Sequence, residues 1–255
     1  MDRSNENSES LNKYIASTGK CSRREADVLV KAGKVTLNGV IAQAGNRVFA
    51  GDTVLIEGEP LQAKPKAVYI IFNKPKGIVC TTDKREKDNI IDYINYHERL
   101  FPIGRLDKPS EGVIFLTNDG DIVNKILRAG NQHEKEYIVT VKQPINKKFL
   151  SDMSKGVPIL GTVTKRCELE QINKFTFRII LVQGLNRQIR RMCEYYNYDV
   201  LALQRVRVMN IKLGKLPTGQ WREFSKMELD TLKASVQNSS KVSAAQSKKK
   251  DSHKN

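Results

Sequence analysis

A single carboxylate between two cations is the first group in the sequence that could carry out chemistry. Asp107 lies in the segment Gly104-Arg105-Leu106-Asp107-Lys108, which Pro102 and Pro109 enclose. A carboxylate in such a loop can act as a nucleophile or as a base, and the cations beside it stabilise its ionised form. The structural alternative is an ordinary turn residue with ion-pair neighbours, and the pentapeptide by itself does not separate the two.

Three arginines gather at the start of a helix expected after Gly184. Four apolar residues follow the i, i+3, i+4, i+7 spacing of a buried helical stripe, namely Ile189, Met192, Cys193 and Tyr196. Arg187, Arg190 and Arg191 fall on the remaining surface. Because the helix macrodipole disfavours cations at this end, a phosphate or a carboxylate such as Asp107 should compensate them. A solvated helix face is the alternative.

An aromatic residue stands near the start of an expected strand. Tyr137 follows Glu134-Lys135-Glu136 and alternates with Val139 and Val141. An aromatic side chain at a strand end can stack on an unpaired nucleic-acid base. Packing in the core is the more ordinary role of a strand tyrosine, so this signal gains weight only beside the others.

The charge distribution points to a polyanionic partner. The chain has a formal net charge of +16, and residues 65–235 contain 30 Lys and Arg against 19 Asp and Glu. Such an excess favours contact with nucleic acid. The cysteines show no metal-ligand spacing, so we expect no metal; they are Cys21, Cys80, Cys167 and Cys193. With no long apolar run and no signal-peptide core, we expect a cytoplasmic protein away from membranes.

A first module is expected over residues 10–63, after a disordered stretch at 1–9. Ser22 and Glu25 fit a capping box that starts its second helix, and Asn38-Gly39 fits the type I′ turn of a hairpin. Basic side chains on or beside that helix suit a nucleic-acid backbone; they are Lys20, Arg23, Arg24, Lys31 and Lys34.

A linker at residues 64–67 should lead to a second domain at 68–235, followed by a disordered Lys- and Ser-rich tail at 236–255. Alternating apolar residues predict strands in this domain, among them Phe175, Phe177, Ile179 and Leu181. Ser225 and Glu228 predict the capping box of a last helix. Strands and helices mix without a βαβ rhythm, so the expected fold class is α+β with a mixed, mostly antiparallel sheet.

The first module resembles a known family of RNA-binding domains. The run LNKYIASTGKCSRREADVLVKAGKVTLNGVIAQAGNRVFAGDTVLI is similar to an S4 domain over nearly its full length. The SRREAD helix, the VTLNG hairpin and the GD turn occur together in that order. The resemblance implies contact with RNA but does not define an enzyme, since S4 domains also occur in ribosomal proteins.

The second domain resembles the pseudouridine synthases of the RsuA, RluB, RluE and RluF type. GRLD at 104–107, KEY at 135–137 and QGLNRQIRRM at 183–192 follow the family's order, supported by NKPKG at 73–77. The stretch GVPILGTVTKRC is most similar to the RluF branch, which acts on large-subunit ribosomal RNA. The resemblance implies conversion of a specific uridine to pseudouridine in 23S ribosomal RNA after the base has been flipped out.

The same resemblance implies roles for individual residues. Asp107 would be the catalytic aspartate, and Arg190 would pair with it. Tyr137 would stack on the target base, and Arg105 would help hold the flipped nucleotide. Further RNA contacts are expected at Lys74, Lys76, Arg187 and Arg191. The reaction requires no metal and no cofactor, and we expect a monomer.

Several alternatives stay open at this point. Small-subunit ribosomal RNA or a tRNA could be the substrate, and the carboxylate could attack the sugar or remove a proton at C2′. A non-catalytic S4 protein that only binds RNA is a rival reading. A glycosidase-like hydrolase is another, but it would need a second carboxylic acid that the sequence does not offer.

Overall fold

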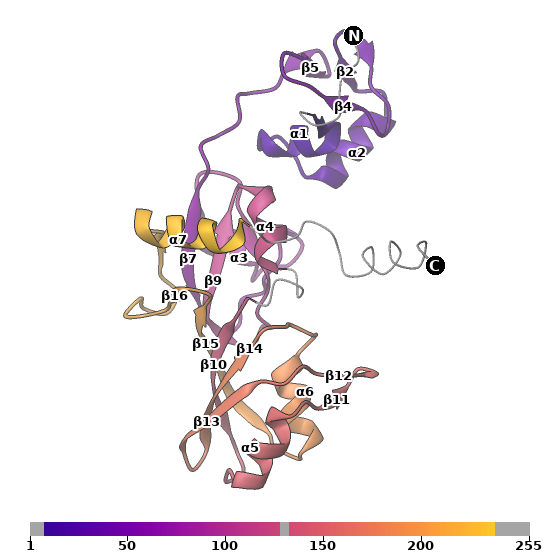
Figure 1. Cartoon of the computed structure of the whole chain (residues 1–255). Coiled ribbons are helices and arrows are strands. Elements are labelled where there is room, and N and C mark those ends of the chain that lie inside the picture. Colours follow the sequence, from indigo (N-terminus) through magenta and orange to yellow (C-terminus); the bar gives the residue numbers. More distant parts are fainter. Residues whose placement is uncertain (1–7, 128–132, 238–255) are drawn as a thin grey trace. The chain divides into compact units, whose positions relative to one another are not determined.

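The computed structural model describes residues 8–127 and 133–237, which form two compact units divided between Ala67 and Val68 (Figure 1). Most of the disorder expected at 1–9 and 236–255 lies outside the described residues. The expected limits of the two folded domains, 10 and 235, were nevertheless too narrow, because Glu9 pairs in a short strand and the last helix continues through Val236.

The first unit places two helices against short strands. Helix α1 spans Leu11–Ser17 and α2 spans Arg23–Lys31. An antiparallel sheet has the order β3-β2-β5-β6, and a two-stranded sheet joins β1 to β4. The strands are β1 Glu9–Ser10, β2 Val35–Leu37, β3 Val40–Ile41, β4 Arg47–Val48, β5 Val54–Ile56 and β6 Glu59–Pro60. Fully buried Ile15, Ala26 and Val35 form the centre of its core.

Two local predictions for this unit are confirmed. The Ser22 hydroxyl accepts a hydrogen bond from the Glu25 amide at 3.1 Å, and the Glu25 carboxylate accepts one from the Ser22 amide at 2.6 Å. Asn38 and Gly39 have φ angles of 52° and 80°, as a type I′ turn requires. The helix start and the hairpin are therefore encoded locally.

Removing the capping hydroxyl tests how much this helix start contributes to stability. We expect Ser22→Ala to lower the free energy of unfolding of the first unit by about 1 kcal/mol, because an amide at the start of α2 loses its acceptor. Urea unfolding followed by circular dichroism measures the change. Ser225→Ala removes the equivalent cap in the second unit and should leave the transition of the first unit in place; equal shifts in both variants would contradict the prediction.

A nine-stranded sheet forms the second unit, with the order β13-β14-β10-β15-β9-β7-β17, β8 beside β9 and β16 beside β15. Only β9 and β15 run parallel among these described strand pairs, so the expected mixed, mostly antiparallel sheet is confirmed. The strands are β7 Tyr69–Lys74, β8 Phe101–Ile103, β9 Glu111–Thr117, β10 Lys135–Val141, β13 Glu168–Asn173, β14 Thr176–Leu181, β15 Val200–Val208, β16 Ile211–Lys212 and β17 Trp221–Glu223. A separate hairpin joins β11 Pro158–Ile159 to β12 Thr162–Val163.

Apolar side chains cover both faces of this sheet. On β7, Ile70 and Phe72 belong to one hydrophobic cluster, while Tyr69 and Ile71 belong to another. This division follows from the alternation of side chains along a strand. The first cluster includes α3 Ile90–Ile94, α5 Lys147–Ser154 and α6 Gln188–Tyr195, and the second includes α4 Gly120–Leu127 and α7 Lys226–Val236 (Figure 1).

Within the described ranges, none of the helices combines the length and hydrophobicity that crossing a bilayer demands.

Candidate active site

The three sequence motifs of the second unit meet at one cleft of about 750 Å³. Its walls come from the loop before β9, from the start of β10 and from the segment that leads into α6. The motif residues that line it are Arg105, Leu106, Asp107, Tyr137, Arg187 and Ile189. Residues up to 84 positions apart in the chain are thus brought to one place, which supports a shared role.

Hydrogen bonds hold the loop that carries Asp107. The Leu106 amide donates to the Cys80 thiol sulfur at 3.3 Å, and the Gly77 amide donates to the Lys108 carbonyl at 2.8 Å. The loop therefore rests on the NKPKG segment and the strand-like stretch that follows it. The Asp107 side chain is 33% exposed, so a ligand can reach a carboxylate whose backbone is fixed.

The cation beside Asp107 is not the expected one. Arg187 Nη1 lies 3.9 Å from Asp107 Oδ2, whereas no ion pair joins Arg190 to Asp107 in the part of the chain that the structure describes. Arg187 caps α6 with a left-handed backbone, at a φ of 49°, and this geometry turns the residue out of the helix. The expected ion pair between Arg190 and Asp107 is therefore absent from the described residues, although the Asp107 charge acts on Arg190 and opposes the lowering of its pKa.

Arg190 instead ties the segment that follows Asp107 to the sheet. Its Nη2 donates to the Pro109 carbonyl at 3.3 Å and to the Ser110 hydroxyl at 3.5 Å, and its Nη1 donates to the Val200 carbonyl at 3.2 Å. Burial lowers the pKa of the guanidinium from its usual value, and the Arg187 charge lowers it further. Arg190 thus positions the segment that follows Asp107.

Apolar side chains line the same cleft as the carboxylate. Tyr137, Leu106 and Ile189 are 9%, 8% and 4% exposed and belong to the same hydrophobic cluster. Since all three also line the cleft, they offer a flat ring and aliphatic walls to a ligand. Arg105, by contrast, is exposed at the cleft.

A β-bulge brings in a cation that the sequence patterns do not indicate. Where β10 pairs with β15, Glu136 lies opposite Arg207 and Tyr137 lies opposite Arg205. The register of the two strands therefore shifts between Glu136 and Tyr137. The extra residue of a bulge interrupts the regular alternation of side chains, so Arg205 and Arg207, which are two positions apart, point to different faces of the sheet. Arg205 consequently lines the cleft at 4% exposure, and its Nε donates to the Val113 carbonyl at 2.7 Å.

Gly112 permits the close approach that accompanies this bulge. A Cβ atom at Gly112 would lie 2.2 Å from the Arg205 carbonyl oxygen, and the residue has a φ of 110°. Both conditions require glycine at this point of the parallel pair β9–β15. Lys135 also lines the cleft, and the sequence patterns did not indicate this either.

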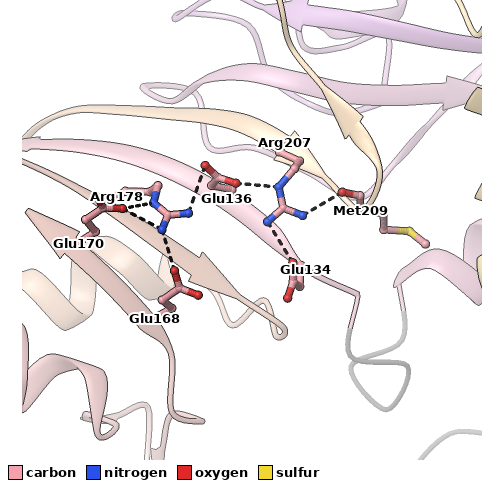
Figure 2. A network of polar contacts seen from close by, with 7 residues as sticks. All are labelled: Glu134, Glu136, Glu168, Glu170, Arg178, Arg207 and Met209. Atoms are coloured by element: carbon pink, nitrogen blue, oxygen red, sulfur yellow. Dashed lines mark hydrogen bonds and ion pairs between the residues drawn. The ribbon is translucent and has the colours of Figure 1, made fainter. Parts of the chain in front are cut away.

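The opposite face of the sheet carries a network of ion pairs (Figure 2). Arg207 contacts Glu136 at 2.7 Å and Glu134 at 3.0 Å. Arg178 lies 3.7 Å from Glu136 and also contacts two carboxylates of β13. Glu134 and Glu136, which lie beside Lys135 and Tyr137 in the chain, therefore form their ion pairs on the face away from the cleft.

The remaining expected RNA contacts fall into two groups. Lys74 is fully buried, and its Nζ donates to the carbonyls of Pro75 and Ile78 at 2.8 and 2.7 Å, so the expectation of an RNA contact there was wrong. Burial lowers the pKa of this lysine. The others have accessible side chains, although Lys34 pairs with Glu57 at 2.6 Å; they are Lys20, Arg23, Arg24, Lys31, Lys34, Lys76, Arg187 and Arg191.

Within residues 8–127 and 133–237, no group of three or more His, Cys, Asp or Glu side chains is placed so that it could hold a metal ion.

Comparisons with known proteins bear on both units. The family model for RNA pseudouridylate synthase matches residues 68–195, and that for the S4 domain matches residues 9–54. Two proteins called dual-specificity RNA pseudouridine synthase RluF are similar to this chain. The one from Escherichia coli K12 is 56% identical over 90% of this chain and 80% of its own length, and the one from Salmonella typhi is 54% identical over 94% and 84%.

More distant relatives agree with these matches. The ribosomal large subunit pseudouridine synthase B of Bacillus subtilis is 32% identical over 89% of this chain and 97% of its own length. A crystal structure of a pseudouridylate synthase superposes with a TM-score of 0.65 at 27% identity, covering 88% of this chain and 99% of that one. Sequence and fold therefore lead to the same family of proteins.

Proposed function

Because the chain belongs to the RNA pseudouridylate synthase family, whose members isomerise uridine to pseudouridine in RNA, we propose that its substrate is large-subunit ribosomal RNA and that Asp107 carries out the chemistry. The observation that carries this proposal is the cleft in which Asp107, Tyr137 and the start of α6 meet. The name of the Bacillus subtilis relative supports the large subunit as the source of the substrate.

The reaction needs one reactive carboxylate and no change of oxidation state. The N1–C1′ bond of uridine breaks, the uracil turns, and a C5–C1′ bond forms, while C5 loses a proton and N1 gains one. Asp107 either attacks the sugar at C1′ or removes a proton at C2′. Its partial exposure, its held backbone and the Arg187 cation at 3.9 Å suit an ionised carboxylate in either role.

The cleft also suits a base that has left its stack. Flipping a nucleotide out of a helix costs a few kcal/mol, and stacking on an aromatic ring returns roughly 1–3 kcal/mol. Tyr137 offers that ring, and Leu106 and Ile189 supply apolar walls that exclude water while the uracil is detached. Exposed Arg105 is placed to contact the displaced strand.

Pseudouridine formation on defined RNAs tests the proposal. Transcripts of 23S RNA, 16S RNA and bulk tRNA, labelled with tritium at uridine C5, release tritium only when C5 forms the new bond. We expect release from 23S RNA by the wild-type protein and a single new pseudouridine on mapping. Because the RluF relatives are named dual-specificity, release from the tRNA pool as well is a second expected outcome. Release from 16S RNA alone, or none from any RNA, would overturn the proposal.

The S4 unit is proposed to hold the RNA without entering the chemistry. Arg23 and Arg24 are exposed at the start of α2. We expect the double variant Arg23→Gln, Arg24→Gln to raise KM several-fold with kcat nearly unchanged, and to lower the salt slope of binding by up to about 1.8 on duplex RNA, since each lost phosphate contact removes about 0.9. Steady-state assays at several salt concentrations measure both.

A matched pair of charges provides the control for that variant. Lys64 and Lys66 lie in the stretch between β6 and β7, which carries no helix or strand. Changing both to Gln removes the same total charge and should leave the salt slope nearly unchanged. Equal effects of the two double variants would show that only net charge matters and that the basic face of α2 is a solvated surface.

We further propose that the protein acts as a monomer in the cytoplasm, where ribosomal RNA is made and assembled. The cleft is built from residues 80–208 of a single chain, so no second copy is needed to complete it. Light scattering of the purified protein at working concentration gives the mass directly, and a dimer mass would contradict this part of the proposal.

A further inference from the structure

We propose that Lys135 binds a phosphate group of the substrate RNA inside the cleft and that Arg205 strengthens this contact. The inference rests on the proposed function, because it names residues that position the same RNA substrate. Lys135 is a partly buried cation that no ion pair joins to a carboxylate within residues 8–127 and 133–237, and the acidic residues beside it in the chain bind other cations.

Lys135 is a partly buried cation whose hydrogen-bond partner is a neutral group. It lines the cleft, and its Nζ donates to the His133 carbonyl at 3.0 Å. No ion pair joins it to a carboxylate in the ranges that the structure describes, and the adjoining residues 128–132 contain no Asp or Glu. An ammonium group has three donors, and a buried charge is normally paired. The cleft wall therefore carries an ammonium group whose hydrogen bond goes to a neutral carbonyl and whose charge has no carboxylate beside it in the described residues.

The acidic residues nearest in sequence cannot supply that anion. Glu134 and Glu136 flank Lys135, but side chains alternate along β10, and both carboxylates bind Arg207 on the other face (Figure 2). Arg178 holds Glu136 from a second side. Glu134 or Glu136 could pair with Lys135 only if its ion pair with Arg207 were broken.

Arg205 adds a second buried positive charge to the same wall. The bulge of β15 places it opposite Tyr137, and its Nε is bound to the Val113 carbonyl. Burial, and then the Arg205 charge, lower the pKa of Lys135 to about 8. Among the described residues, the charged side chains that line the cleft are four cations, Arg105, Lys135, Arg187 and Arg205, and one carboxylate, Asp107.

A phosphate is the group of the substrate that this excess of charge fits. Uracil is neutral, so recognition of the base does not call for an uncompensated cation. A nucleotide that brings its C1′ atom to Asp107 also brings its own phosphates close to the cleft. In a site from which water is excluded, an ammonium–phosphate hydrogen bond is short and strong. A phosphate of the RNA backbone is therefore the anion that binds Lys135.

The test compares Lys135→Met with Lys135→Arg in the full-length protein, using tritium release from the 23S transcript. Methionine keeps the length of an apolar stem, so the fold should persist with an unchanged or raised Tm. We expect Lys135→Met to raise KM about tenfold or more, as the loss of a charge-assisted hydrogen bond implies. It should also lower the salt slope of kcat/KM by roughly 0.7. Lys135→Arg should recover most of both.

The dependence on pH separates this role from simple packing. Below pH 8 Lys135 is protonated and binds the phosphate; above pH 8 it loses the proton, so kcat/KM of the wild-type protein should fall as pH rises through that value. The fall should be absent in Lys135→Arg. The other titratable groups among the described residues that line the cleft are Cys80, Arg105, Asp107, Tyr137, Arg187 and Arg205, and both variants keep all of them.

Lys142 provides the matched control. It is exposed just beyond the other end of β10, and Lys142→Met should leave KM, salt slope and pH profile unchanged. A Lys135→Met variant that loses kcat with the wild-type KM and salt slope would overturn the inference, because Lys135 would then only support Tyr137. Failure of the proposed function would appear differently, as absence of tritium release by the wild-type protein itself.

Discussion

Replacing Asp107 by asparagine should lower kcat by about a thousandfold or more, the scale seen when a sole nucleophile or base is removed. The amide has the same shape as the carboxylate but can neither attack C1′ nor take a proton at C2′. The loop should keep its structure, because backbone and thiol contacts hold it and none of them uses the Asp107 side chain. RNA affinity should consequently stay within a few-fold.

Single-turnover tritium release measures the rate, and filter binding of the same RNA measures the affinity. Asp88→Asn is the matched control, since Asp88 pairs with Lys108 of the same loop at 3.1 Å but does not line the cleft. It should retain nearly full activity. If Asp107→Asn kept more than about a tenth of the wild-type rate, another group would be carrying out the reaction.

Arg190→Lys should reduce kcat about a hundredfold, because a small misplacement of a catalytic group has effects of this size. The guanidinium reaches Pro109, Ser110 and Val200 at once, and a lysine with a single nitrogen cannot span all three. The segment after Asp107 would lose its link to the sheet. Since Arg190 acts through the loop, KM should change little while kcat falls.

Arg187→Lys tests the other arginine at the same site. A lysine there keeps a positive charge near Asp107, so we expect only a few-fold loss of kcat. Steady-state kinetics of both variants, with circular dichroism to confirm folding, give the comparison. A large loss in Arg187→Lys beside a nearly normal Arg190→Lys would mean that Arg187 holds the carboxylate and that the contacts of Arg190 are dispensable.

Short-range features were predictable from the sequence because their causes are local. The capping boxes at Ser22 and Ser225 involve residues three positions apart, and the structure contains both. Asn38-Gly39 adopts the backbone that its residue types favour. The apolar stripe of α6 depends only on helical spacing, and Ile189, Met192 and Cys193 are buried as expected, whereas Tyr196, the C-cap of the helix, is only partly buried. In each case the interacting groups lie within two turns of chain.

The meeting of the three motifs could be anticipated only through resemblance to a family. Asp107, Tyr137 and α6 are distant in sequence, and the hydrophobic periodicity of a sequence does not indicate which strands are neighbours in a sheet. The sheet order sets β10 beside β15, and β15 beside β9, which follows the Asp107 loop directly. That order arises from packing of whole elements and brings the three motifs to one cleft.

The charges in the cleft were decided by tertiary structure alone. Lys74 and Lys76 look alike in sequence, yet one side chain ends in the protein interior and the other stays half exposed. Arg205 and Arg207 are two positions apart on β15, and in a regular strand such residues point to the same face. The bulge between them turns Arg205 into the cleft and Arg207 towards Glu136. The sequence alone thus determined the motifs and the local elements; which cations accompany Asp107 depended on a one-residue shift in strand pairing, and no local residue pattern encodes such a shift.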